Sequence, residues 1–231
     1  MDLHLKDKVA LVTGGSRGLG RAICAGLAAE GAKVAIHYYR DRREAIDLVD
    51  EAAELAEELT AEHGVETAAV PGDVSNSEDI VRMFDESQAR LGPLNVLVNN
   101  AGVWPTAYVK DITEAQWDRT LAINLKGPFL TCREAVRRWL AAGRTGRNVN
   151  ISSQAAFRGA TTGHADYAAA KAGLVNFTVS LARELALHGI HVNAVAPGMM
   201  RTDMAQEALE ANEEKYIKRT PLGRIAEPEE I

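Results

Sequence analysis

Residues 9–20 have the sequence VALVTGGSRGLG, and this stretch decides the fold class. The apolar run Val9–Val12 is typical of a buried strand, and a helical pattern over Arg21–Ala29 follows the glycine-rich turn directly. Glycines at positions 14, 18 and 20 allow the backbone to turn tightly and to approach a pyrophosphate, while the amides that open the next helix attract an anion. A glycine-rich turn alone is also compatible with a flexible loop, but its position between strand and helix favours a dinucleotide-binding unit.

The same alternation of short apolar runs and longer helical patterns continues along the chain. Apolar strands with little polar alternation are expected where helices cover both faces of a parallel sheet. The pattern therefore predicts a doubly wound α/β fold of the Rossmann type, formed as a single domain over residues 1–231. Its further strands are predicted at Val34–Ile36, Thr67–Val70, Val96–Val98, Val149–Ile151 and His191–Ala196, and its further helices at Ala45–Glu62, Glu78–Leu91, Glu114–Ala141 and Ala165–Leu187.

The composition is that of an ordinary globular protein, and 231 residues are enough to bury a core. The 26 basic and 32 acidic residues give a net charge of -6, which argues against nucleic acid or an anionic membrane as the main partner. Cys24 and Cys132 fall in predicted amphipathic helices, so we expect core thiols and neither a disulfide framework nor a metal site. Neither a signal peptide nor a membrane-spanning run is visible, so a cytoplasmic location is expected.

Tyr167 and Lys171 form the candidate catalytic pair. They lie four residues apart in a predicted helix and therefore share one face, about 6 Å apart along its axis. A cation in that place can stabilise the phenolate of a tyrosine, whose unperturbed pKa is about 10. The pair alone is also compatible with an ordinary helix surface. Upstream, Ser152 and Ser153 end a predicted strand, where a parallel sheet presents side chains to its ligand crevice, so a hydroxyl there can bind a substrate oxygen.

The motifs together resemble one enzyme family. The glycine turn, with glycines at 14, 18 and 20, resembles the Thr-Gly-x-x-x-Gly-x-Gly signature of the short-chain dehydrogenase/reductase family. The segment Asn99-Asn100-Ala101-Gly102, after the predicted fourth main strand, resembles that family's second signature. The resemblance extends from about Lys8 to the C-terminus. It implies an oxidoreductase that transfers hydride between a nicotinamide cofactor and a ketone or secondary alcohol.

The resemblance also implies a role for each catalytic residue. Tyr167 would protonate the carbonyl oxygen, Ser153 would orient and polarise it, and Lys171 would lower the tyrosine pKa and contact the nicotinamide ribose. Asn124 is similar to a family asparagine that interrupts a helix and holds a water in a proton relay, although a helix-breaking role without a relay is the alternative. The interval from Ser153 to Tyr167 is one residue longer than is usual in the family. Ser152 is therefore the alternative to Ser153, because strand neighbours point to opposite faces.

The cofactor is expected to be NADP(H), with NAD(H) as the alternative. The end of the second predicted strand carries Tyr38 where a carboxylate would bind the adenosine ribose of NAD(H), while Arg17 and Arg40 are placed to pair with a 2′-phosphate. By resemblance, Asp73 would contact the adenine ring, and the Pro197-Gly198 turn with Thr202 would lie against the nicotinamide. The predicted cofactor-binding residues are Gly14, Ser16, Arg17, Gly18, Leu19, Gly20, Tyr38, Arg40, Asp73, Val74, Asn100, Ala101, Gly102, Tyr167, Lys171, Pro197, Gly198 and Thr202.

The substrate is less sharply defined by the sequence. Its pocket is expected to be lined by Val103, Trp104, Pro105, Gln154, His164, Met199 and Met200, beneath a flap over residues 199–220. The segment 168–171 and Pro221-Leu222-Gly223-Arg224 resemble 3-oxoacyl-carrier-protein reductases most, which implies an acyl-thioester substrate. Sugar and small-alcohol dehydrogenases of the same family are the alternative, and a non-catalytic dinucleotide-binding regulator is an alternative of another class. The resemblance further implies a homodimer or homotetramer and a C-terminal strand that this chain lacks, as a trimmed or fragmentary sequence would.

Overall fold

The computed structural model describes residues 2–41, 46–160 and 162–231; for residues 40, 41, 46 and 47 it describes only the backbone. Its centre is a six-stranded parallel sheet with the strand order β5-β2-β1-β6-β7-β8. The strands are β1 (Val9–Val12), β2 (Lys33–Tyr38), β5 (Thr67–Pro71), β6 (Val96–Asn99), β7 (Arg147–Ile151) and β8 (His191–Val195). The order reverses between β1 and β6, so the carboxyl ends of these strands open a crevice there.

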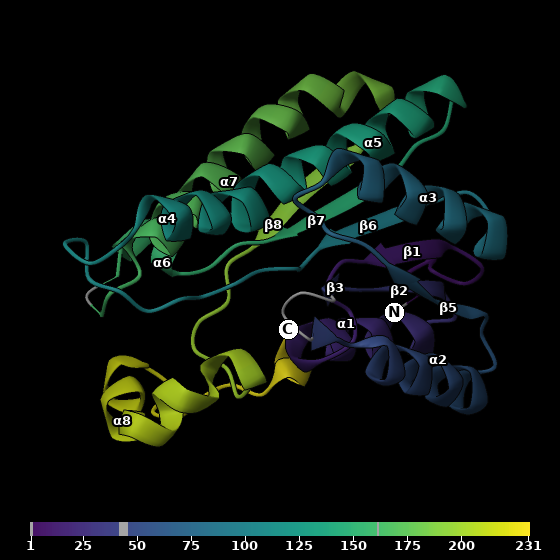
Figure 1. Ribbon diagram of the computed structural model, residues 1–231. Coiled ribbons are helices and arrows are strands. Elements are labelled where there is room, and N and C mark those ends of the chain that lie inside the picture. Colours follow the sequence, from purple (N-terminus) through teal and green to yellow (C-terminus); the bar gives the residue numbers. More distant parts are fainter. Residues whose placement is uncertain (1, 42–45, 161) are drawn as a thin grey trace.

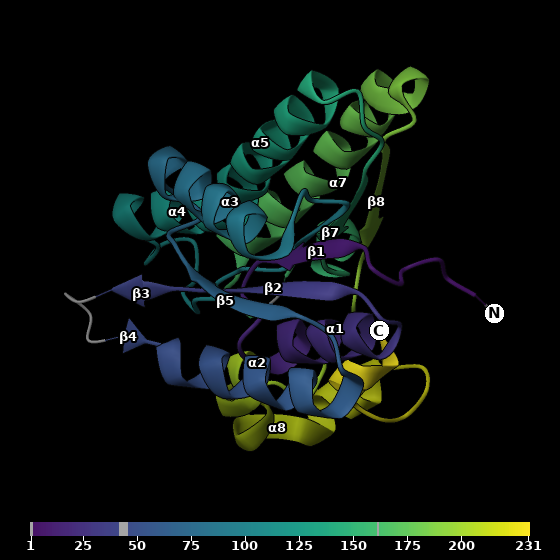
Figure 2. The same ribbon diagram turned by 90° about the vertical axis from the view of Figure 1, so that its right-hand side faces the viewer.

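Helices cover both faces of the sheet, as Figures 1 and 2 show. On one face α1 (Gly18–Ala29) and α2 (Val49–His63) pack through Cys24, Leu55 and Leu59. On the other face α3 (Ser77–Leu91), α5 (Gly127–Ala141) and α7 (Ala165–Leu185) pack through residues such as Phe84 and Trp139. These two apolar layers confirm the predicted doubly wound α/β fold and the burial of both cysteines.

The predicted helix Ala45–Glu62 begins too early. Part of this segment pairs as a short antiparallel hairpin, β3 (Arg40–Asp41) with β4 (Ile46–Asp47), and α2 follows only from Val49. Asp50 and Glu51 then occupy the first turn of α2, where the helix dipole favours negative charge. Ile46 and Asp47, which the helical periodicity placed in the helix, therefore belong to a local strand pairing.

The predicted helix Glu114–Ala141 is continuous but not uniform. It consists of α4 (Glu114–Leu121), a π-helical turn η1 (Ala122–Lys126) and α5. Thr113 caps its start by accepting a hydrogen bond from the backbone N–H of Gln116 at 3.1 Å. The irregular turn is centred on Asn124, which the sequence marked as an interruption.

The C-terminal segment forms a separate small cluster. The 3-10 turn η3 (Asp203–Ala205) and helix α8 (Gln206–Arg219) pack on Ile225 through Ala205 and Leu209. The 3-10 turn η4 (Pro228–Glu230) follows, and in Figure 1 this whole segment lies on the α1 side of the sheet, across from α4 and α6 (Ala155–Arg158). A further short turn, η2 (Ala186–His188), closes α7. No helix among the described residues is long and apolar enough to cross a membrane.

Candidate active site

One large cleft opens at the carboxyl ends of the strands, with a volume of about 1420 Å³. The cleft is lined by residues that lie far apart along the chain, from the glycine turn near the N-terminus to the segment before α8. Of the predicted site, Gly14, Ser16, Arg17, Gly18, Leu19, Gly20, Asp73, Val74, Asn100, Ala101, Gly102, Asn124, Ser153, Tyr167, Lys171, Pro197, Gly198 and Thr202 line this cleft. The predicted pocket residues Val103, Trp104, Pro105, Gln154, His164, Met199 and Met200 line it as well.

The glycine turn is a backbone cradle that no side chain could enter. A Cβ at Gly20 would lie 2.0 Å from the carbonyl oxygen of Gly14, and one at Gly14 would lie 3.0 Å from Cα of Ala101. Gly14 also adopts a φ of 61°, a left-handed conformation that side chains disfavour. The turn therefore presses α1 against the loop after β6 and brings the N-terminus of α1 to the cleft, which fits a pyrophosphate.

The second signature segment holds this cradle in place. The Asn100 side chain donates to the carbonyls of Thr13 and Gly14 at 3.0 and 2.9 Å. In return, the Thr13 hydroxyl accepts the backbone N–H groups of Asn100 and Ala101 at 2.9 and 3.0 Å. The two glycine-containing loops thus form one hydrogen-bonded unit at the ends of β1 and β6.

His37, a residue not proposed from the sequence, joins the cradle to the next loop. Its Nδ1 accepts the backbone N–H of Gly14 at 3.0 Å, so its Nε2 carries the proton that is donated to the Gly72 carbonyl at 3.0 Å. Complete burial lowers the pKa of His37 to about 4, against the weaker opposing effects of the Gly72 carbonyl, Asp73 and Asp79. The ring is therefore neutral at pH 7, which both hydrogen bonds require. Only its position at the end of a buried strand marks it in the sequence.

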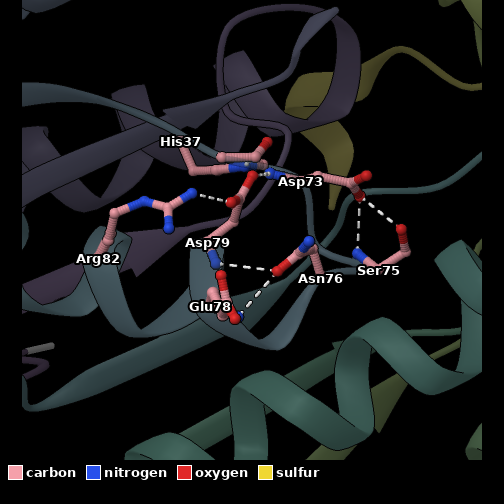
Figure 3. Close-up of polar contacts among 8 residues, drawn as sticks. His37, Asp73, Ser75, Asn76, Glu78, Asp79 and Arg82 are labelled. Carbon is pink, nitrogen blue, oxygen red and sulfur yellow. Dashed lines mark hydrogen bonds and ion pairs between the residues drawn. The ribbon is translucent and has the colours of Figure 1, made fainter.

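Figure 3 shows the polar corner beyond His37, between β5 and α3. The Asp73 carboxylate accepts the backbone N–H and the hydroxyl of Ser75 at 2.8 and 2.7 Å, while Asn76 caps α3. The backbone N–H of Asp73 donates to Asp79 at 2.9 Å, and Asp79 in turn pairs with Arg82. Asp73 therefore both orders its own loop and lines the cleft.

At the end of β2 the structure corrects the sequence by one position. The Tyr38 side chain is 5 % exposed and packs in the apolar layer under α1 and α2, away from the cleft. The neighbouring Tyr39 lines the cleft instead, as expected when successive side chains alternate between the faces of a strand. The side chain of Arg40, the other predicted phosphate ligand, lies outside the described residues.

The two serines after β7 have different surroundings. The Ser152 hydroxyl is buried and donates to the backbone carbonyl of Lys171 at 3.1 Å, which ties β7 to α7. Ser153 is only partly buried, lines the cleft and forms a side-chain hydrogen bond with Tyr167. The structure therefore brings Ser153, rather than Ser152, to the tyrosine.

Tyr167 and Lys171 lie side by side on α7. The Lys171 ammonium is 5.6 Å from the centre of the tyrosine ring and donates to the Ile151 carbonyl at 2.8 Å. Burial lowers the pKa of Lys171 to about 8. Burial also raises the pKa of Tyr167, more than the Ser153 hydrogen bond lowers it. With its pKa raised in this way, the phenol is protonated at neutral pH.

Asn124 is fully buried in the π-helical turn. Its amide donates to the carbonyls of Val103 and Thr120 at 3.0 Å each, and its oxygen accepts the Val103 N–H at 3.3 Å. A Cβ on Gly102 would lie 2.8 Å from the Asn124 oxygen and 3.8 Å from the Lys171 ammonium, so these groups converge on one point of backbone.

Asp166 is a second positioning residue that the sequence did not single out. Its buried carboxylate accepts from Gln116 at 3.1 Å, from the Thr120 hydroxyl at 2.9 Å and from the backbone N–H of Tyr167 at 2.9 Å. The Gln116 side chain therefore reaches from α4 to α7. These contacts tie the helix that carries Tyr167 to the helix that carries Asn124.

Comparisons with known proteins agree with this geometry. The model of the short chain dehydrogenase family matches residues 8–213. The chain is 38% identical over 231 residues to the 3-oxoacyl-[acyl-carrier-protein] reductase FabG of Aquifex aeolicus, covering 100% of this chain and 89% of that protein. It is 37% identical over 227 residues to the 3-oxoacyl-[acyl-carrier-protein] reductase of Synechocystis sp., covering 98% and 87%.

The fold comparison gives the same answer. A dehydrogenase/reductase from Sinorhizobium meliloti superimposes with a TM-score of 0.87 at 35% identity, over 99% of this chain and 86% of that one. The glycine cradle, the cleft and these matches together identify a nicotinamide-dependent oxidoreductase that acts on a CH–OH/C=O pair. The chain belongs to the short-chain dehydrogenase/reductase family.

Proposed function

We propose that this protein is an NADP(H)-dependent ketoreductase of 3-oxoacyl thioesters in which Ser153, Tyr167, Lys171 and Asn124 form the catalytic set. The observation that carries the proposal is that all four residues line the same cleft as the glycine cradle. A regulator without chemistry would have no need for this set of hydroxyl, phenol and ammonium groups in one place.

When bound, the nicotinamide dinucleotide supplies the hydride for carbonyl reduction, or accepts it from an alcohol. Ser153 donates to the carbonyl oxygen and orients it. Tyr167 gives its proton to the same oxygen as negative charge develops, and its raised pKa keeps that proton available at neutral pH. Lys171, mostly cationic at pH 7 with a pKa of about 8, stabilises the phenolate that remains.

The preference for NADP(H) is supported by the groups at the adenosine end of the cleft. His37, Tyr38 and Tyr39 offer no carboxylate to a ribose hydroxyl, while Arg17 lines the cleft at the start of α1. It forms an ion pair with Asp203 at 3.9 Å, and both side chains are more than half exposed. Arg17 is therefore a cation available to a 2′-phosphate.

Fluorescence titration with NADPH and NADH tests this preference. We expect tighter binding of NADPH, and a loss of about tenfold in NADPH affinity for Arg17→Ala with little change for NADH. Arg21→Ala is the matched control, because Arg21 lies one turn later on α1, pairs with Glu58 and does not line the cleft. Equal affinities for both cofactors in the wild-type protein would refute the preference.

The thioester assignment is supported by the relatives named above and by the apolar wall of the cleft. Met199, Met200 and Met204 lie along it, and such flexible thioether side chains adapt to an acyl chain. We assign segment 199–220, which includes these residues and α8, as the substrate flap.

The test is oxidation of NADPH in the presence of an acetoacetyl thioester, a keto sugar or a small ketone. Thioester reduction at the highest kcat/KM is expected, whereas preference for the sugar or small ketone would favour a dehydrogenase of that kind. Tyr167→Phe should abolish turnover and leave NADPH binding nearly unchanged, because the change removes one hydroxyl and keeps the ring. An active Tyr167→Phe variant would exclude the proposed proton donor.

We also propose a homodimer or homotetramer in the cytoplasm. Phe129 and Leu140 on α5 and Val179 on α7 are each at least 42 % exposed, and apolar side chains gathered on neighbouring helices favour an interface between protein chains. Val179→Glu should shift sedimentation towards the monomer if these helices form the interface.

A further inference from the structure

His164 occupies a distinctive place in the cleft that the catalytic scheme does not use. It is the N-cap residue of α7, three residues before Tyr167, and both residues line the cleft. Only 4 % of its surface is exposed, and that part belongs to the cleft wall. Its ring stacks on Trp104, with centroids 4.2 Å apart and planes inclined by 22°.

One ring nitrogen of His164 anchors it to the loop after β6. Nδ1 lies 2.9 Å from the carbonyl oxygen of Pro105, which can only accept, so Nδ1 must carry the proton. Burial lowers the pKa of His164 against the opposing effects of the Pro105 carbonyl and Asp166. The neutral ring therefore has one tautomer, with the unshared pair on Nε2.

The second ring nitrogen has no partner within the part of the chain that the structure describes. Among the described residues, Nε of Arg133 is the only fully buried side-chain nitrogen or oxygen that has no hydrogen-bond partner. Nε2 of His164 has no partner either, so it is not fully buried. His164 lines the cleft, while Trp104 stacks on its ring and the Pro105 carbonyl binds Nδ1, so we take the cleft as the opening that Nε2 reaches. Nε2 is therefore an acceptor that opens to the cleft in an otherwise apolar stack, and a ligand that expels the water from it must supply a donor in its place.

We propose that Nε2 of His164 accepts a hydrogen bond from a hydroxyl or amide N–H that the substrate carries close to its reacting carbonyl. This inference deepens the proposed function, on which it rests, by giving His164 the selection of donor-bearing ketones. A site that binds a substrate donor discriminates strongly against analogues that lack it, because the buried acceptor is then left unpaired. The donor could be the hydroxyl of a hydroxyketone or the amide of a thioester arm.

Two matched substrate pairs separate these sources. Hydroxyacetone and methoxyacetone differ in one hydroxyl proton, and S-acetoacetyl-N-acetylcysteamine and its N-methylated analogue differ in one amide proton. With the wild-type protein and NADPH, we expect kcat/KM to favour the donor-bearing member of one pair by roughly tenfold. The pair that shows the preference identifies the donor.

Two variants separate recognition from the anchoring role of the same ring. In His164→Asn the side-chain amide can still donate to the Pro105 carbonyl, as Nδ1 does, but no acceptor remains at the position of Nε2. We expect this variant to lose the preference, so that kcat/KM for the donor-bearing ketone falls to that for its donor-free analogue. His164→Gln places an amide oxygen near the position of Nε2 and should restore part of the preference, although it loses the anchor.

The outcomes decide between three situations. A preference that disappears in His164→Asn and partly returns in His164→Gln supports the inference. Equal kcat/KM within both pairs for the wild-type protein, or an equal loss for both members in His164→Asn, overturns it while ketoreductase activity stands. Absence of turnover with every ketone overturns the proposed function and this inference with it.

Discussion

Acidification should destabilise this protein through His37 in particular. The ring is completely buried with a pKa of about 4, against an ordinary value of 6.5. Above pH 6.5 both the folded and the unfolded chain hold it neutral, so the stability that its neutral contacts provide is fully present. As the pH falls below 6.5, the unfolded chain binds a proton that the folded chain refuses until about pH 4.

The size of the effect follows from this interval. Each pH unit below the unfolded pKa costs about 1.4 kcal/mol, so about 2 kcal/mol is lost by pH 5 and about 3 kcal/mol by pH 4. The structural reason is the hydrogen bond from the Gly14 N–H, because a protonated Nδ1 becomes a donor that faces another donor at 3.0 Å. The nearby carboxylates of Asp73 and Asp79 oppose the shift but do not outweigh burial.

Urea unfolding at pH 7.5, 6.5, 5.5 and 5.0 measures this loss when wild type is compared with His37→Asn. The asparagine oxygen can still accept the Gly14 N–H but does not titrate, so the variant should be less stable at pH 7.5 and show a shallower decline with falling pH. His188→Asn, on an exposed turn, is the matched control and should follow the wild-type curve. Between pH 7.5 and pH 5.0 the free energy of unfolding should fall by about 2 kcal/mol more for the wild type than for His37→Asn. An equal fall for both proteins would refute the reasoning.

Three further substitutions test the rest of the site. Gly20→Ala would place a Cβ 2.0 Å from the Gly14 oxygen, and calorimetry should show NADPH binding weakened at least tenfold. Gly26→Ala on the same helix is the control, because its Cβ would meet no atom within 4 Å, and it should stabilise the fold by about 0.5–1 kcal/mol. Because the pKa of Lys171 is about 8, kcat/KM for carbonyl reduction should decline above that pH, and a Lys171→Arg variant that retains activity should lack this decline. Asp166→Asn leaves three donors with one carbonyl oxygen and should cost about 1–3 kcal/mol in thermal unfolding.

The parts of this protein that the sequence predicts best are those decided by neighbours in the chain. β1 spans Val9–Val12 as predicted, and the glycine turn leads into α1 because strand, turn and helix are all encoded within 21 residues. Helix ends are similarly local: Gly64 and Gly189 adopt φ values of 66° and 65°, which end α2 and η2 in the left-handed conformation. Glycine is informative in a sequence because it is the residue type that favours this left-handed conformation.

The features that the sequence missed depend on contacts between distant segments. His37 matters because β2 places it between Gly14 and Gly72, and no local pattern records that contact. Asp166 resembles any acid in a first helical turn until α4 packs against α7. Tyr38 and Tyr39 point to opposite faces of the sheet, because successive side chains in a strand alternate. A prediction that is wrong by one residue therefore exchanges a cleft residue for a core residue.

The unusual interval between Ser153 and Tyr167 shows why such distances along the chain decide little. Ser153 follows the last residue of β7 by two positions, and Tyr167 is the third residue of α7, so each is placed by the end of an element anchored to the sheet. The Ser152 bond to the Lys171 carbonyl and the Lys171 bond to the Ile151 carbonyl fix the two ends against each other. The contacts that join β7 to α7 therefore place Ser153 and Tyr167, and an added residue in the interval between them does not by itself separate the two side chains.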